Sequence, residues 1–157
     1  MTDDLLVLSN GLYFRGRLLG TPLEATGEVI FNTSLTGYQE ILSDPSYAGQ
    51  IVTMTYPQIG NYGVNPEDME SGTVHATALV IRELSPVASN WRSTQTLDGW
   101  LGEQRIPILA GVDTRALART LRETGECSGL IVPANLQHTL DMLREEALAL
   151  PSMVGQN

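Results

Sequence analysis

The order of the apolar segments is the sequence feature that most constrains the fold. Two short apolar runs, residues 5–8 and 12–14, flank an Asn10-Gly11 pair, which predicts a β-hairpin because both turn residues tolerate positive φ. Further strands are predicted at 28–33, 51–56, 74–84, 106–110 and 129–132, a long loop at 57–71, and helices at 36–42, 93–103, 113–123 and from Asn135 onward. Strands come first and then alternate with helices, which predicts a mixed α/β domain.

The length of 157 residues predicts one domain, or one domain with a short tail. A chain of this size can build a core without disulfides, and its single cysteine, Cys127, excludes a bridge within the chain. The acidic start, residues 1–4, lacks the features of a signal peptide, and no apolar run approaches membrane-spanning length. We therefore expect a cytoplasmic protein.

The charge balance limits the classes of partner. The chain has 18 acidic residues against 9 basic ones, and every basic residue is arginine. An acidic chain is a poor match for nucleic acid or for an anionic membrane surface, so we expect neither as a partner. The absence of lysine excludes a phosphate-binding loop with its lysine, and it excludes a Schiff base.

Catalytic candidates are few. Cys127 stands at the entry to an apolar strand, and only His75 and His138 could activate it. We interpret Cys127 as a structural cysteine, because cysteine is commonly buried. We interpret His75 as a hydrogen-bonded residue near the core, because it has no neighbours at metal-ligand spacing. The sequence thus predicts no catalytic residue, no metal site and no cofactor in this chain.

The segment from Asn32 to Tyr47 mixes polar, small and aromatic residues. Glu40 and Asp44 lie four residues apart, which fits a helix face and a cap as well as a pair of carboxylates. Asp44 and Pro45 predict a turn in which Ser46 offers a hydroxyl group. One hypothesis is a stand-alone module that binds a small ligand between residues 32–46 and the glycine-containing loop 60–65.

Three arginines fall on one face of the helix predicted at 113–123. Arg115, Arg119 and Arg122 are spaced i, i+4 and i+7, so a third of the positive charge forms a stripe. Two readings stay open. The stripe is a solvated face balanced by Glu123 and Glu126, or it docks a protein partner, since arginine is enriched at interfaces.

Four stretches of the chain resemble one family. They are NTSLTGYQEILSDPSYAGQIVTMTYPQIGNYGVN (32–65), VHATALVIREL (74–84), SNWR (89–92) and GVDTRALAR (111–119), and the likeness begins near the turn at residues 9–11. Together they resemble the amino-terminal domain of the small subunit of glutamine-hydrolysing carbamoyl-phosphate synthase. A match of this length is far more specific than any short motif.

The resemblance implies a swivelling β/β/α-type fold and a place in a larger ligase. The family's enzyme makes carbamoyl phosphate from glutamine, bicarbonate and ATP, for arginine and pyrimidine synthesis. Residues 1–150 are expected to form the amino-terminal domain and residues 151–157 to begin an interdomain linker, with the glutamine amidotransferase domain and its catalytic triad absent from this chain. The expected partners are that domain and the large synthetase subunit. Ser46 matches the family's serine that contributes to the glutamine pocket.

Overall fold

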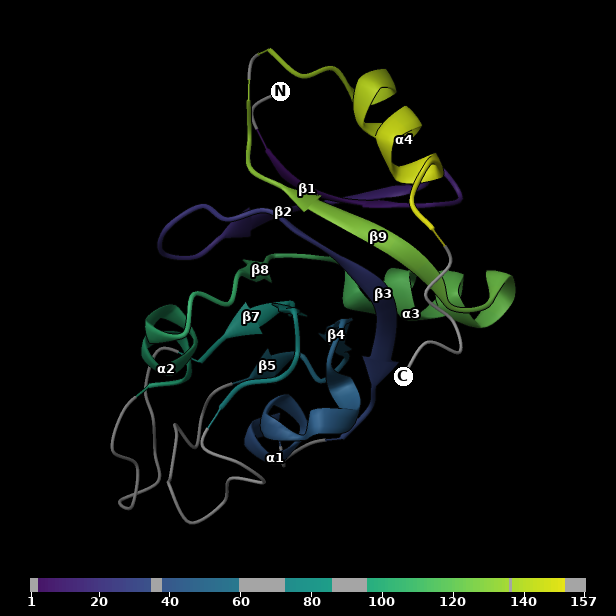
Figure 1. The fold of residues 1–157 in the computed structure, drawn as a ribbon. Coiled ribbons are helices and arrows are strands. Elements are labelled where there is room, and N and C mark those ends of the chain that lie inside the picture. The colour runs from purple at the N-terminus through teal and green to yellow at the C-terminus, as the bar shows by residue number, and fades with distance from the viewer. Residues whose placement is uncertain (1–2, 35–37, 60–72, 86–95, 136, 152–157) are drawn as a thin grey trace.

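The computed structural model describes residues 3–34, 38–59, 73–85, 96–135 and 137–151 (Figure 1). Seven of the described strands form one sheet that closes into a barrel, in the order β1-β2-β8-β6-β4-β3-β9. The elements are β1 (Asp4–Leu8), β2 (Tyr13–Leu18), β3 (Ala25–Asn32), α1 (Tyr38–Ser43), the 3₁₀ turn η1 (Pro45–Tyr47), β4 (Gln50–Met54), β5 (Gln58–Ile59), β6 (Ala78–Val80), β7 (Glu83–Leu84), α2 (Leu97–Glu103), β8 (Ile108–Ala110), α3 (Thr114–Thr124), β9 (Cys127–Val132) and α4 (Leu140–Leu148).

The barrel combines parallel and antiparallel pairing. β3 pairs with β4, β4 with β6 and β6 with β8 in parallel, while β1, β2 and β9 make antiparallel pairs. Parallel neighbours need crossover segments, and the helices α1 and α2 lie within such crossovers. The mixed α/β class predicted from the segment order is confirmed.

The predicted hairpin joins β1 to β2. Val7 pairs with Tyr13 across the turn, and Gly11 has a φ of 91°, a conformation in which a Cβ would be strained. The side-chain oxygen of Asn10 accepts a hydrogen bond from the backbone N–H of Leu12 at 3.0 Å. The two turn residues therefore act as the sequence pattern predicts.

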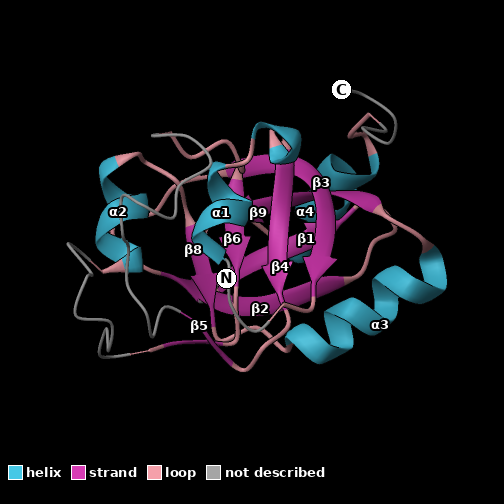
Figure 2. Ribbon diagram, turned by 90° about the horizontal axis from the view of Figure 1, so that it is seen from below, coloured by secondary structure: helices cyan, strands magenta, loops and turns pink. Residues whose placement is uncertain are grey.

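Three apolar clusters hold the elements together. One fills the barrel interior, where Leu117 and Leu121 of α3 pack against inward side chains of the strands. A second lies outside the barrel, where α1 and α2 cover β4, β6 and β8. A third lies on the opposite side, where Leu143 and Ala147 of α4 pack on β1 and β9. Figures 1 and 2 show α4 on the side of the barrel away from α1 and α2.

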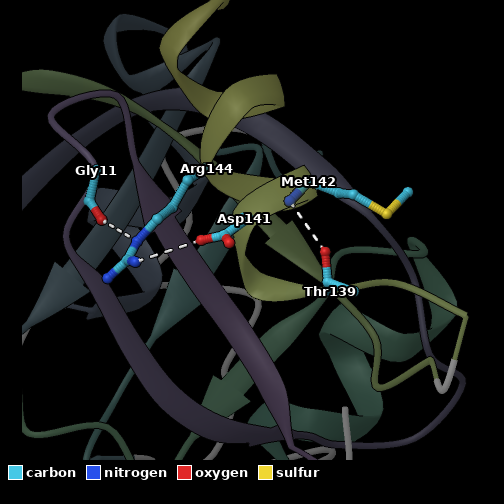
Figure 3. Close-up of polar contacts among 5 residues, drawn as sticks. All are labelled: Gly11, Thr139, Asp141, Met142 and Arg144. Carbon is cyan, nitrogen blue, oxygen red and sulfur yellow. Dashed lines mark hydrogen bonds and ion pairs between the residues drawn. The ribbon is translucent and has the colours of Figure 1, made fainter.

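Polar contacts fix the position of α4 (Figure 3). The Thr139 hydroxyl caps the helix by accepting a hydrogen bond from Met142 N at 3.2 Å. Arg144 donates from Nε to the Gly11 carbonyl oxygen at 3.0 Å, and its Nη1 lies 3.8 Å from Asp141. The hairpin turn and the last helix, which are far apart in sequence, are therefore joined directly.

The single strand predicted at 74–84 is wrong. The chain forms β6 inside the barrel and then β7, which pairs with β5 in a separate two-stranded sheet. The break falls at Ile81 and Arg82, whose carbonyl oxygens accept hydrogen bonds from Val112 and Gly111 respectively. These loop contacts turn the chain away from the barrel. The apolar pattern of residues 74–84 gives no sign of this break.

The predicted helix start at Asn135 is also wrong, because α4 begins at Leu140 after the Thr139 cap. The Asn135 side chain instead accepts a hydrogen bond from Gln137 N at 2.8 Å, which forms a local turn. Part of the loop predicted at 57–71 is the strand β5. Residues 60–71 of that predicted loop lie outside the described residues. So does residue 36, where the helix 36–42 was expected to begin.

Candidate functional site

Ser46 lies at the centre of the 3₁₀ turn η1. The Asp44 carboxylate accepts a hydrogen bond from Ser46 N at 2.9 Å, and Pro45 fixes the first position of the turn. Tyr47 N and Ala48 N donate to the carbonyl oxygens of Asp44 and Pro45, which closes the turn. The predicted turn is confirmed. Ser46 is exposed, and its hydroxyl has no hydrogen-bond partner among the described residues.

The turn is anchored to the barrel on two sides. Tyr47 packs against the apolar cluster under α1, and Ala48 forms an isolated bridge with Ala76. The Gly49 carbonyl oxygen accepts a hydrogen bond from Glu28 N at 3.2 Å. These contacts hold the backbone of the turn in place and leave the Ser46 side chain exposed.

One cross-strand row links the strand after the turn to the end of the described chain. Gln50, four residues after Ser46, pairs with Glu28, and Glu28 pairs with Ser128 on its other side. The Ser128 hydroxyl donates a hydrogen bond to the Pro151 carbonyl oxygen at 2.8 Å. The strand register therefore places Gln50 and Ser128 on either side of Glu28, and Pro151 is bonded to the second of them.

Glu28 is a buried acidic residue in the middle of β3. Its carboxylate accepts a long hydrogen bond from the Gln50 side chain at 3.4 Å and shares a second one with the carboxyl group of Glu126. Burial raises the pKa of Glu28 and the Glu126 contact raises it further, while Gln50 lowers it. Sequence reasoning missed this pair, because Glu28 and Glu126 become neighbours only through the β3–β9 register.

Cys127 begins β9 and His75 precedes β6, and these two strands do not pair in the barrel. Burial raises the pKa of the Cys127 thiol, and its hydrogen bonds with Ser9 offset this only in part. A raised thiol pKa lowers the fraction of thiolate, which is the nucleophilic form. The backbone N–H of His75 donates to the Leu42 carbonyl oxygen at 2.8 Å, and the residue is half-buried beside β6.

The arginine stripe occupies the outward face of α3. Asp113 caps this helix by accepting a hydrogen bond from Ala116 N at 3.1 Å. Arg115, Arg119 and Arg122 are all exposed, and none forms an ion pair with Glu123, Glu126 or any other described residue. Within the described part of the chain, Arg122 has an aromatic neighbour, with its guanidinium 5.1 Å from the ring centre of Phe31.

Within the described ranges no three His, Cys, Asp or Glu side chains gather closely enough to hold a metal ion. None of the helices described is both long enough and apolar enough to cross a membrane.

Residues 6–131 match the family described as carbamoyl-phosphate synthase small chain, CPSase domain. The chain is 52% identical to the carbamoyl phosphate synthase small chain of Syntrophotalea carbinolica over 98% of its length, and 52% identical to that of Chlorobaculum tepidum over 96%. It is 50% identical to the small chain of Salmonella typhimurium, again over 98%. The chain belongs to the carbamoyl-phosphate synthase small chain family.

The match covers only part of each relative. The chain spans 40% of the Syntrophotalea protein, 41% of the Chlorobaculum protein and 40% of the Salmonella protein.

Proposed function

We propose that residues 1–150 form the amino-terminal domain of the glutaminase subunit of a carbamoyl-phosphate synthase, and that residues 151–157 begin the linker to an amidotransferase domain. The observation that carries this proposal is the family match over residues 6–131. The domain's role is to dock and position other parts of the enzyme, which makes carbamoyl phosphate from glutamine, bicarbonate and ATP. The proposal assigns this chain no catalytic residue, metal or cofactor, and places the enzyme in the cytoplasm.

Ser46 is proposed to contribute its hydroxyl group to the glutamine pocket of that enzyme. Two features of the turn support the proposal: the hydroxyl is exposed, and the turn is anchored to the barrel. One serine is too little for a pocket by itself, since ligand sites bury most of the ligand surface.

A hybrid small chain tests the role of Ser46. Residues 1–150 replace the matched part of the Salmonella typhimurium small chain, which is combined with its large subunit. Ser46→Ala should raise the KM for glutamine about tenfold, the effect of one lost hydrogen bond, and should leave ammonia-dependent synthesis unchanged. Ser34→Ala, at another exposed serine, is the matched control. An unchanged KM in the Ser46 variant would remove Ser46 from the glutamine pocket.

The alternative function, a stand-alone ligand-binding module, is tested on the 157-residue chain alone. Calorimetry with glutamine should show no binding, and the isolated chain should not hydrolyse glutamine. Saturable binding to the isolated chain would favour the alternative. Hydrolysis near the rate of an intact small subunit would contradict the docking role.

The arginine stripe of α3 is proposed to dock the large synthetase subunit. Its support is that Arg115 and Arg119 are exposed cations without an ion-pair partner among the described residues, on a chain with a net charge of −9. Reversing Arg115, Arg119 and Arg122 to glutamate should reduce co-purification of the hybrid with the large subunit. Arg105→Glu, at an exposed arginine beyond α2, is the control, and unchanged assembly would return the stripe to the solvated-face reading.

A further inference from the structure

The outward face of β2 carries two arginines on an acidic protein. Arg15 and Arg17 are exposed, while Gly16 between them faces the barrel, where an added Cβ would lie 2.7 Å from the Ala110 carbonyl oxygen. The chain as a whole has a net charge of −9, but here two arginines lie with one carboxylate, that of Asp3. A local excess of positive charge favours partners with negative charge.

These two arginines border an open groove of about 390 Å³. The rest of its lining is small, with Gly16, Ala110 and Gly111 along the floor and Asp3 beside them. In the described part of the chain, α4 packs mainly on β1 and β9 and reaches β2 at Tyr13, where Arg144 lies 5.3 Å from the ring centre. α3 packs on β3 and β4, and Arg15 and Arg17 stay exposed. A floor with so little side chain allows the backbone of a partner to approach closely.

Both guanidinium groups are available to a partner. Arg15 lies 3.7 Å from Asp3, but the two side chains are 69% and 51% exposed, and ion pairs exposed to solvent are weak. That pair can therefore be exchanged for a stronger one. Arg17 forms no ion pair with any residue that the structure describes. Arg15 also lies over Tyr13, with 6.0 Å to the ring centre, which keeps it along the outward face.

The spacing of the two arginines selects the shape of the partner. Residues i and i+2 of a strand project from the same face roughly 6.8 Å apart, and alternate residues of an extended partner have the same spacing. Both edges of β2 are already paired, with β1 and with β8. A partner therefore lies across the face and is held by its side chains, because no backbone edge is open to it.

We infer that the β2 groove, bordered by Arg15 and Arg17, docks an extended acidic segment of a partner protein with carboxylates at alternate positions. This surface is separate from the α3 stripe and does not depend on the Ser46 assignment. A small anion would fill little of the groove.

Fluorescence anisotropy on the 157-residue chain tests the inference, with a labelled peptide of alternating glutamate and threonine as the probe. Binding should be saturable at low salt and should weaken as salt screens the charges. Combining Arg15→Glu with Arg17→Glu should reduce affinity at least about tenfold, because like charges then face each other. Arg17→Gln should fall between the double variant and the unaltered chain.

Arg105→Glu, beyond α2, is the matched control and should bind as the unaltered chain does, because Arg105 is exposed and lies outside the groove lining. Thermal unfolding of each variant establishes that the fold is retained, which is expected because both β2 arginines are exposed. The inference is overturned if the peptide does not bind, if the double variant binds as well as the unaltered chain, or if Arg105→Glu loses as much affinity. Equal competition by inorganic phosphate would show a small-anion site instead.

Discussion

Gly129 occupies a position in β9 where the barrel leaves no room for a side chain. An added Cβ would lie 2.5 Å from Cγ2 of Val29 and 3.1 Å from Cδ1 of Leu6, both in the barrel interior. Gly129→Ala should lower the free energy of unfolding by about 1–3 kcal/mol, the usual cost of overpacking a core. Urea denaturation measures the loss.

Gly102 provides the matched control for that substitution. It lies in α2, has no heavy atom within 4 Å of an added Cβ, and is exposed. Gly102→Ala should raise stability by up to about 1 kcal/mol, because alanine loses less backbone entropy in a helix. Equal effects of the two substitutions would contradict the close packing described for β9.

The buried carboxyl group of Glu28 gives stability a pH dependence of known sign. Its pKa in the folded chain is raised, so its contribution is fully present below the unfolded pKa and is lost as pH rises through the folded pKa. Glu28→Gln cannot ionise and avoids this loss. The stability of the variant relative to the unaltered chain should therefore increase from about pH 4 to pH 8.

Urea denaturation across that pH range measures the difference for Glu28→Gln. Glu24→Gln, at an exposed residue, is the control for simple loss of a carboxylate. A difference for Glu28→Gln that stays constant, or that shrinks toward pH 8, would show that ionisation of Glu28 does not oppose folding.

At the scale of elements, Asp4 joins three parts of the chain. Its Oδ2 accepts a hydrogen bond from Leu18 N at 2.6 Å, at the end of β2, and its Oδ1 accepts from Ala134 N at 2.7 Å, just after β9. Asp4→Ala leaves two backbone donors without this partner and should cost about 1–3 kcal/mol of stability.

Asp4→Asn separates the two contacts, because the amide keeps only one acceptor oxygen. It should therefore recover part of the stability that Asp4→Ala loses. Thermal unfolding of both variants is the measurement. If alanine and asparagine were equally tolerated, the carboxylate would have no role in joining β1 to the ends of β2 and β9.

Local sequence patterns predicted the elements whose signals are local. The Asn10-Gly11 hairpin and the Asp113 cap of α3 follow from residues in contact along the chain. The division of residues 74–84 into β6 and β7 did not follow, because the bend depends on hydrogen bonds from Gly111 and Val112. The start of α4 was missed because Asn135 and Thr139 are both good caps, and packing against β1 and β9 decides between them.

For the whole molecule, the barrel determines which distant residues meet. The class of fold was predictable from the order of segments, but barrel closure was not, because it depends on pairings such as β1 with β9 and β2 with β8. Ser46 was found through a family resemblance, and local chemistry predicted only its turn. The row that joins Gln50, Glu28 and Ser128, with Pro151 bonded to Ser128, was missed because only the strand register creates it.

The central claim is that this chain serves as the amino-terminal domain of a carbamoyl-phosphate synthase small chain. The most direct measurement is carbamoyl phosphate synthesis by the hybrid small chain, combined with the Salmonella typhimurium large subunit, with glutamine and separately with ammonia. We predict that the hybrid supports synthesis with both nitrogen donors. Synthesis from ammonia without any synthesis from glutamine, by a hybrid that is folded and soluble, would contradict the claim.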